Sequence, residues 1–213
     1  MAVLSGVITR RKIWPLATQS MLGSAMAGHK AARQRDIPMT TLSRSGATLL
    51  AIDLQARMMG AIHDAEGVVA EAQRLITGAR LLDVPVVFTE QNPAGLGTTL
   101  PGLQPQGAIA KMHFDACHEP AFLRALPPGG SAVLMGCEAH VCVLQTALGL
   151  MARGAAVAVV ADAVGSRRAA SKALALDRLA RAGAQVVSAE MVLFEWLESA
   201  DHPRFRDVLA LIR

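Results

Sequence analysis

Cys142 is the residue whose position best fits chemistry. It follows an apolar run, Gly136 and five further residues, and it opens a segment with helical spacing. A thiol in the first turn of a helix lies near the positive end of the helix dipole, which favours the thiolate. The backbone N–H groups of that turn can also bind a developing oxyanion. The position therefore predicts a nucleophile with a lowered pKa, and the alternative is a buried thiol that serves only for packing.

Asp53 and Lys111 are the charged residues that could assist such a thiol. Asp53 ends the apolar run at 47–53, where a carboxylate is costly unless it is paired or hydrated; the alternative is a helix cap or a loop hydrogen bond. Lys111 is the only lysine between Lys30 and Lys172, and taken alone it is a solvated loop residue. Together, an acid could take the thiol proton while an ammonium stabilises the anions. The three residue types thus predict a nucleophilic set.

The elements that must position these residues alternate along the chain. Five apolar runs predict strands, at 47–53, 85–89, 131–136, 155–161 and 185–188. Helical spacing predicts helices at 64–81, 119–126, 140–153, 168–182 and 190–198, with a tail past residue 203. Strands separated by helices predict an α/β fold with a doubly wound, mostly parallel sheet and helices on both faces, in three α/β/α layers. We place this single domain at residues 41–213.

The fold class also predicts where a ligand binds. In such sheets the site lies beyond the carboxyl ends of the strands, so the residues near those ends are candidates to bind substrate. The expected substrate-binding residues are Gln55, Gln91, Asn92, Phe114 and His140. The glycine-rich patterns that hold dinucleotides or nucleoside triphosphates do not follow the first strand.

The composition and the net charge of the chain indicate which kinds of binding partner are disfavoured. Of the 213 residues, 52% are hydrophobic and only 3% aromatic, which disfavours nucleic-acid binding by base stacking. Residues 1–35 hold six basic residues and no acid, and the remaining 15 basic and 17 acidic residues leave the body with a net charge of −2. No apolar run reaches the roughly 18–20 residues that span a bilayer. We therefore expect neither a nucleic-acid nor a membrane partner.

The basic segment 1–40 and the cysteines bear on location. We expect this segment to be a basic arm that is disordered, or one that is not translated because translation starts later, for instance at Met39; the alternative is an organelle transit peptide, of which a composition rich in Arg, Ser and Ala is typical. The three cysteines, Cys117, Cys137 and Cys142, form no C-x-x-C pair. An odd number without that motif favours a reducing compartment, and we expect a cytoplasmic protein.

Two segments carry a family resemblance. A-I-D-L-Q around Asp53, and G-C-E-A-H-V-C-V followed by V-L-Q-T-A-L-G-L-M-A-R-G around Cys142, resemble the isochorismatase-like cysteine hydrolases. T-E-Q-N-P-A-G-L-G is similar to the isochorismatase-domain-containing subgroup. The resemblance, over residues 46–197, implies a triad of Asp53, Lys111 and Cys142. It also implies a cis peptide bond between Cys137 and Glu138, and an oxyanion hole formed by the backbone N–H groups of Glu138 and Cys142.

Departures from the family pattern refine the expected activity. Gln91 stands where metal-binding relatives have a His segment, so we expect no metal and no cofactor. True isochorismatases carry Gly at the position of Cys142, which argues against vinyl-ether hydrolysis. The expected activity is metal-independent hydrolysis of a small amide-like C–N bond, with carbamate or ureide cleavage as a related reaction. The alternative is a catalytically silent oligomeric or regulatory protein, and in either case we expect a homo-oligomer.

Overall fold

The computed structural model describes residues 41–212, so the expectations for residues 1–40 lie outside the described residues. Its sheet has six parallel strands in the order β3-β2-β1-β4-β5-β6. The strands are β1 (Ala47–Ile52), β2 (Val86–Gln91), β3 (Ile109–Lys111), β4 (Ser131–Cys137), β5 (Ala156–Gly165) and β6 (Gln185–Val187). The predicted doubly wound parallel sheet is confirmed.

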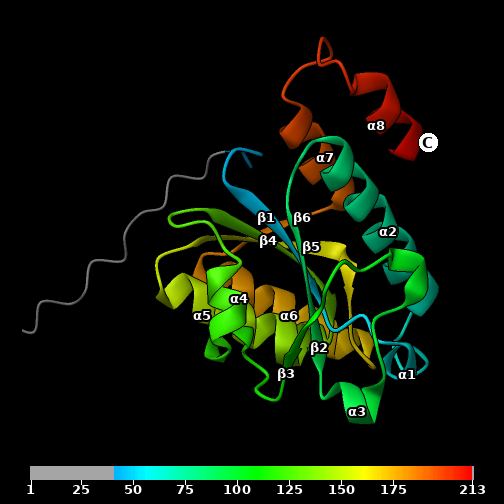
Figure 1. Ribbon diagram of the computed structural model, residues 1–213, viewed down its shortest axis with the longest axis vertical. Coiled ribbons are helices and arrows are strands. Elements are labelled where there is room, and N and C mark those ends of the chain that lie inside the picture. Colours follow the sequence, from blue (N-terminus) through cyan, green and yellow to red (C-terminus); the bar gives the residue numbers. More distant parts are fainter. Residues whose placement is uncertain (1–40, 213) are drawn as a thin grey trace, which may run out of the picture. The chain divides into compact units, whose positions relative to one another are not determined.

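Helices cover both faces of this sheet, and Figure 1 shows α2, α7 and α8 on one side and α4, α5 and α6 on the other. The α-helices are α1 (Ala56–Met59), α2 (Ala65–Leu81), α3 (Pro93–Leu96), α4 (Pro120–Arg124), α5 (Leu144–Ala152), α6 (Ala169–Ala182), α7 (Ala189–Leu197) and α8 (Phe205–Ile212). The crossover from β1 to β2 and the one from β4 to β5 run in opposite directions along the sheet. Right-handed crossovers in opposite directions place their helices on opposite faces.

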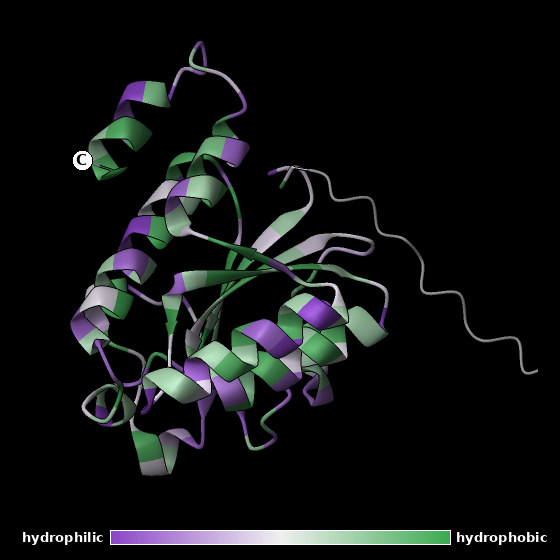
Figure 2. Ribbon diagram, turned by 180° about the vertical axis from the view of Figure 1, so that it is seen from behind, coloured by the Kyte–Doolittle hydropathy of each residue, from purple (hydrophilic) through white to green (hydrophobic). Residues whose placement is uncertain are grey.

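Each face of the sheet has its own apolar core because strand side chains alternate. Leu49 and Ala51 of β1 pack with α2 and α7, whereas Leu50 and Ile52 pack with α5 and α6. All six residues of β1 are buried, as expected of a central strand covered on both sides. Figure 2 shows this pattern as hydrophobic strands between helices that also carry hydrophilic residues.

Three elements differ from the sequence expectation. Lys111 ends β3, a strand of three residues that is too short to show a periodicity. Residues 205–212, expected as a tail, form α8 and bury Val208 against the core. The segment before α5 is a π-helical turn, η3 (Ala139–Val143), which places Cys142 three residues after the first helical residue. Within residues 41–212, no helix is both long and apolar enough to cross a membrane.

Candidate active site

The candidate triad lies at the carboxyl edge of the sheet. Asp53 directly follows β1, Lys111 ends β3, and Cys142 lies in η3, just after β4. The crossovers diverge between β1 and β4, and this is the point at which doubly wound sheets open a binding crevice. The fold thus brings two of the three residues to the switch point and the third to the same edge.

Asp53 and Lys111 form a buried ion pair. Lys111 Nζ lies 2.7 Å from Asp53 Oδ2, and neither side chain is exposed to solvent. The second carboxylate oxygen, Oδ1, accepts a hydrogen bond of 2.7 Å from the Thr89 hydroxyl. Oδ1 is therefore hydrogen-bonded, whereas Oδ2 has no hydrogen bond and is paired with the ammonium charge, which compensates the cost of burying the carboxylate.

The Cys142 thiol interacts with both members of this pair. Burial raises the pKa of Cys142 from 9.0 to about 12; the charge of Asp53 adds to the rise, and the Lys111 ammonium opposes it. The predicted lowered pKa is therefore wrong, because desolvation outweighs the favourable charge of Lys111. Cys142 is only 5% exposed. Because its pKa of about 12 lies well above 7, it is a neutral thiol beside a carboxylate at neutral pH.

The other two cysteines are also buried thiols with raised pKa values. Burial raises the pKa of Cys117 and that of Cys137 to about 12. Neither pKa is influenced by Lys111, which acts on Cys142 alone among the three. Cys142 thus differs from Cys117 and Cys137 in its charged neighbours, and not in its pKa.

The backbone around Asp53 is shaped by a close approach of β1 and β4. Asp53 has a φ of +50°, a left-handed conformation that costs energy for a residue other than glycine. Gly136 pairs with Ile52, the residue before Asp53; it has a φ of +112°, and a Cβ there would lie 2.0 Å from the Ile52 carbonyl oxygen. Only a glycine allows the two strands to approach this closely, and the approach determines where Asp53 lies relative to Cys142.

The segment from Cys137 to Cys142 is held by the loop after β5. The Cys137–Glu138 peptide bond is cis, as the resemblance implied. The Glu138 carboxylate accepts hydrogen bonds from the backbone N–H of Arg167 at 2.9 Å and from its Nε at 3.1 Å. His140 Nδ1 lies 3.0 Å from the hydroxyl of Ser166. The oxyanion hole at Glu138 and Cys142 stays a prediction.

The five residues expected to bind substrate fall into two groups. Gln55 and Gln91 are buried and hydrogen-bonded to each other, since the Gln91 N–H donates to Gln55 Oε1 at 2.8 Å. Asn92 and His140 are half-buried, and Phe114 is 51% exposed. Their contact with a substrate stays a prediction.

The sequence reasoning missed Thr89, Ser166 and Arg167. Thr89 could have been found, because it lies two residues before Gln91 and alternate residues of a strand share one face. Ser166 and Arg167 follow a strand that was expected to end at residue 161 and runs to Gly165. Their contacts depend on those additional strand residues.

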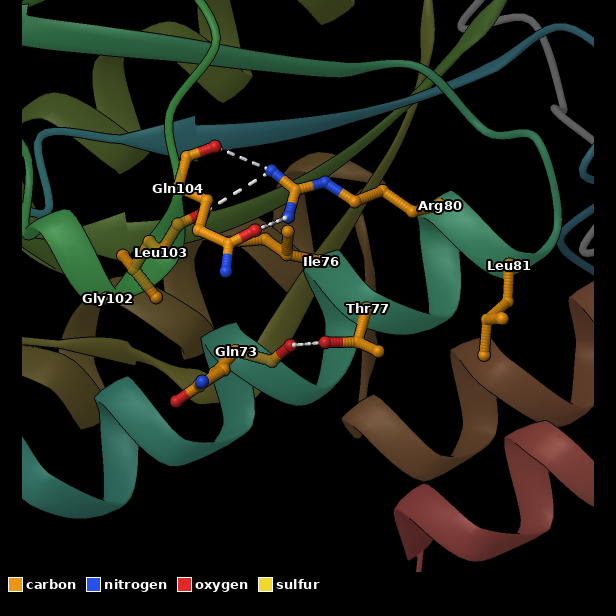
Figure 3. Close-up of a pocket in the computed structure, with 8 residues that line it drawn as sticks. All are labelled: Gln73, Ile76, Thr77, Arg80, Leu81, Gly102, Leu103 and Gln104. Carbon is orange, nitrogen blue, oxygen red and sulfur yellow. Dashed lines mark hydrogen bonds between the residues drawn. The ribbon is translucent and has the colours of Figure 1, made fainter.

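The described residues also bear on metal ligation, and they form a groove outside the triad. Among the side chains of residues 41–212, no group of three or more His, Cys, Asp or Glu is arranged to hold a metal ion. A groove of about 370 Å³ lies between α2 and η1 (Pro101–Leu103), where the Arg80 guanidinium bonds Gln104 (Figure 3). None of its lining residues belongs to the candidate triad.

Comparison with known proteins places this geometry in a family. Residues 47–191 match the isochorismatase domain. The chain is 38% identical over 182 residues to isochorismatase domain-containing protein 1 of Salmo salar; the match covers 83% of this chain and 62% of that protein. The chain thus spans less than two thirds of that relative.

Two solved structures share the fold. A structure described as the MAR1 ribonuclease of Caenorhabditis elegans is 34% identical, with a TM-score of 0.75, and the match covers 81% of this chain and 92% of that one. The YcaC gene product of Escherichia coli, described as an octameric hydrolase of unknown specificity, is 24% identical with a TM-score of 0.73, covering 82% and 88%. The family match spans both the Asp53 and the Cys142 segments, and this chain belongs to the isochorismatase family.

Proposed function

We propose that this protein is a hydrolase that cleaves a small amide-like C–N bond through a covalent intermediate on Cys142. The observation that carries the proposal is the buried ion pair of Lys111 and Asp53, 2.7 Å apart, beside the Cys142 thiol. A nucleophile with a base in reach and a third group that orients the base is the arrangement of covalent catalysis.

Acyl transfer to the enzyme begins with a neutral thiol. Asp53 takes the proton of Cys142 as the sulfur attacks the substrate carbonyl carbon, and the carbonyl oxygen becomes an oxyanion. The backbone N–H groups of Glu138 and Cys142 would bind this oxyanion. The C–N bond then breaks as Asp53 returns the proton to the leaving nitrogen, which leaves a thioester on Cys142.

Hydrolysis of the thioester repeats these steps with water. Asp53 takes a proton from the water, the hydroxyl attacks the thioester carbon, and the C–S bond breaks. The sulfur recovers the proton, so Asp53 is again a carboxylate. Lys111 remains an ammonium throughout and balances the negative charge that moves between Asp53, the sulfur and the oxyanion.

Burial of the triad supports a small-molecule substrate. Asp53 and Lys111 are not exposed at all, so a reacting group has to enter the sheet edge. Of the five residues expected to bind substrate, Asn92, Phe114 and His140 are accessible to solvent, and we propose that they contact the substrate with Gln55 and Gln91. The body's charge of −2, outside residues 1–35, does not favour a polyanionic substrate.

A hydrolysis panel tests the proposed function. Small amides, carbamates and ureides would be incubated with the protein, with Cys142→Ala as the control and a chelator added to a parallel set. We expect release of the amine product that Cys142→Ala abolishes and that chelation leaves unchanged. Because one structural relative is described as a ribonuclease, single-stranded RNA belongs in the panel. RNA cleavage that survives in Cys142→Ala, or no turnover of any substrate, would contradict the proposal.

A further inference from the structure

Gln91 makes a contact that its assignment as a substrate-binding residue does not explain. Its Oε1 accepts a hydrogen bond of 2.7 Å from Lys111 Nζ, the same distance at which the ammonium meets Asp53. The third acceptor of the ammonium is the carbonyl oxygen of His113, at 3.4 Å. Lys111 is thus held between a carboxylate and an amide, with a weaker third contact.

The orientation of the Gln91 amide is fixed by its other end. Nε2 donates to the Met112 carbonyl oxygen at 2.8 Å. A carbonyl oxygen only accepts hydrogen bonds and an ammonium only donates them, so the reverse orientation would lose both bonds. Because Gln91 is 9% exposed, water cannot readily replace either partner. The amide oxygen therefore faces Lys111 permanently.

The backbone of Gln91 is held as tightly as its side chain. The Gln55 amide forms two bonds to it, accepting from the Gln91 N–H at 2.8 Å and donating to the Gln91 carbonyl at 3.1 Å. Gln55 also donates to the Gly97 carbonyl. The end of β2 thus cannot shift away from Lys111 without breaking buried hydrogen bonds.

We propose that Gln91 is a positioning residue, which holds the Lys111 ammonium between Asp53 and Cys142 through a neutral acceptor. This inference rests on the proposed function. The neutrality of the amide matters: Asp53, Lys111 and a protonated Cys142 sum to zero charge. A carboxylate at position 91 would give the site a net negative charge before reaction, opposing both removal of the thiol proton and formation of the oxyanion.

Two substitutions separate this role from simple packing. Gln91→Glu keeps the shape but adds a negative charge, and Gln91→Met keeps the length but removes the acceptor, which disfavours the charged ammonium. Both changes should raise the pKa of Cys142. Alkylation of Cys142 by iodoacetamide, followed by peptide mass spectrometry at several pH values, should slow by about tenfold for each unit of the rise. Gln73→Glu, an exposed position on α2, adds the same charge far from the site and should alkylate at the wild-type rate.

The role of Lys111 as intermediary is tested by a double substitution. In a Lys111→Met background, Gln91→Met should have no further effect on alkylation. Thermal melting of each variant identifies those that remain folded. If Gln91→Met does not fold, Gln91→Glu takes its place in the comparison with wild type. If folded Gln91 variants alkylate like wild type while Lys111→Met is slow, Gln91 has no positioning role and the triad stands. If Lys111→Met also alkylates like wild type, the proposed triad itself is wrong. A Gln91→Met effect that persists without Lys111 would likewise overturn the inference.

Discussion

At the scale of single residues, the site depends on two opposite charges acting on one thiol. The Asp53 carboxylate raises the pKa of Cys142 and the Lys111 ammonium lowers it, both on top of the larger effect of burial. A resting thiol that stays protonated needs a base during attack, and this is the part that the proposal gives to Asp53. Removal of the Asp53 charge should therefore lower the pKa of Cys142, and removal of the Lys111 charge should raise it.

Lys111→Met should raise the pKa of Cys142, and Asp53→Asn should lower it. The first change removes the charge that stabilises the thiolate, and the second removes the charge that opposes it. Turnover should be lost in both variants, since Lys111→Met leaves the developing negative charge unbalanced and Asp53→Asn leaves no base to carry the proton to the leaving nitrogen. The pKa comes from the pH dependence of iodoacetamide labelling, and the turnover from the hydrolysis panel. A pKa shift of the same sign in both variants would contradict this charge arrangement.

Sequence patterns identify these residues but not their contacts. The order of Asp53, Lys111 and Cys142, together with the segments that flank them, is enough to predict a candidate triad, and the structure brings these residues together. The predicted direction of the Cys142 pKa is wrong, because the helix dipole can be read from the sequence whereas the degree of desolvation cannot. The Gln91 contact with Lys111 is equally hidden, since it depends on the pairing of β2 with β3.

At the scale of elements, the approach of β1 to β4 determines the geometry of the site. Their register pairs Ile52 with Gly136. Ile52 lies directly before Asp53, and Gly136 lies two residues before Glu138. A Cβ added at Gly136 would meet the Ile52 backbone. Asp53 directly follows β1 and Cys142 lies in the turn after β4, so a shift of one strand moves these two residues of the candidate triad relative to each other.

Gly136→Ala should therefore separate Asp53 from Cys142. The new Cβ would overlap the Ile52 carbonyl oxygen, and the φ of +112° disfavours alanine. We expect a loss of about 1–3 kcal/mol in the free energy of unfolding. Urea unfolding measures the loss, and the Cys142 alkylation rate should change as well. Gly60→Ala is the matched control, since nothing lies within 4 Å of its added Cβ. Equal stability of the two variants would show that the close approach is not required.

The elements predicted from the sequence are those whose apolar run or helical spacing is visible, whatever their length. The five predicted strands and five predicted helices all exist, including the three-residue β6 and the five-residue α4. The two missed elements are β3, which lies just after a segment expected to be a loop, and α8, which follows Pro203 in a segment expected to be a tail. The π-helical turn around Cys142 cannot be foreseen, since nothing in its residue types distinguishes it from the start of an α-helix.

At the scale of the whole molecule, the buried thiols link stability to pH. Cys117, Cys137 and Cys142 each have a pKa raised from 9.0 to about 12. Above pH 9 the unfolded chain loses these protons while the folded protein keeps them, so the folded state becomes less favourable as the pH rises. Below pH 9 the thiols are protonated in both states, so they do not make the free energy of unfolding depend on pH.

The free energy of unfolding should fall as the pH rises from 9 toward 12. Urea unfolding at a series of alkaline pH values measures this slope. Cys137→Ala removes the least exposed of the three thiols and should make the slope shallower, even though the variant is less stable at every pH. An unchanged slope in Cys137→Ala would show that this thiol does not ionise on unfolding in that range.

Assembly is the second property of the whole molecule that can be tested. Exposed apolar side chains include Met112, Phe114, Leu174 and Phe194, which are 67%, 51%, 71% and 40% exposed. Burying such side chains against another copy is favourable, so we expect a homo-oligomer. Light scattering after size exclusion should give a multiple of the 22.4 kDa chain mass. A mass of one chain at micromolar concentration would contradict the expectation.

The central claim is that Cys142 becomes acylated during turnover. Intact-protein mass spectrometry after rapid acid quenching would detect this state directly with any amide that the panel shows to be hydrolysed. We predict a mass increase equal to the acyl group, mapped to Cys142 by peptide analysis and absent from Cys142→Ala. Hydrolysis that proceeds in Cys142→Ala, or an acyl group located on another residue, would contradict the account.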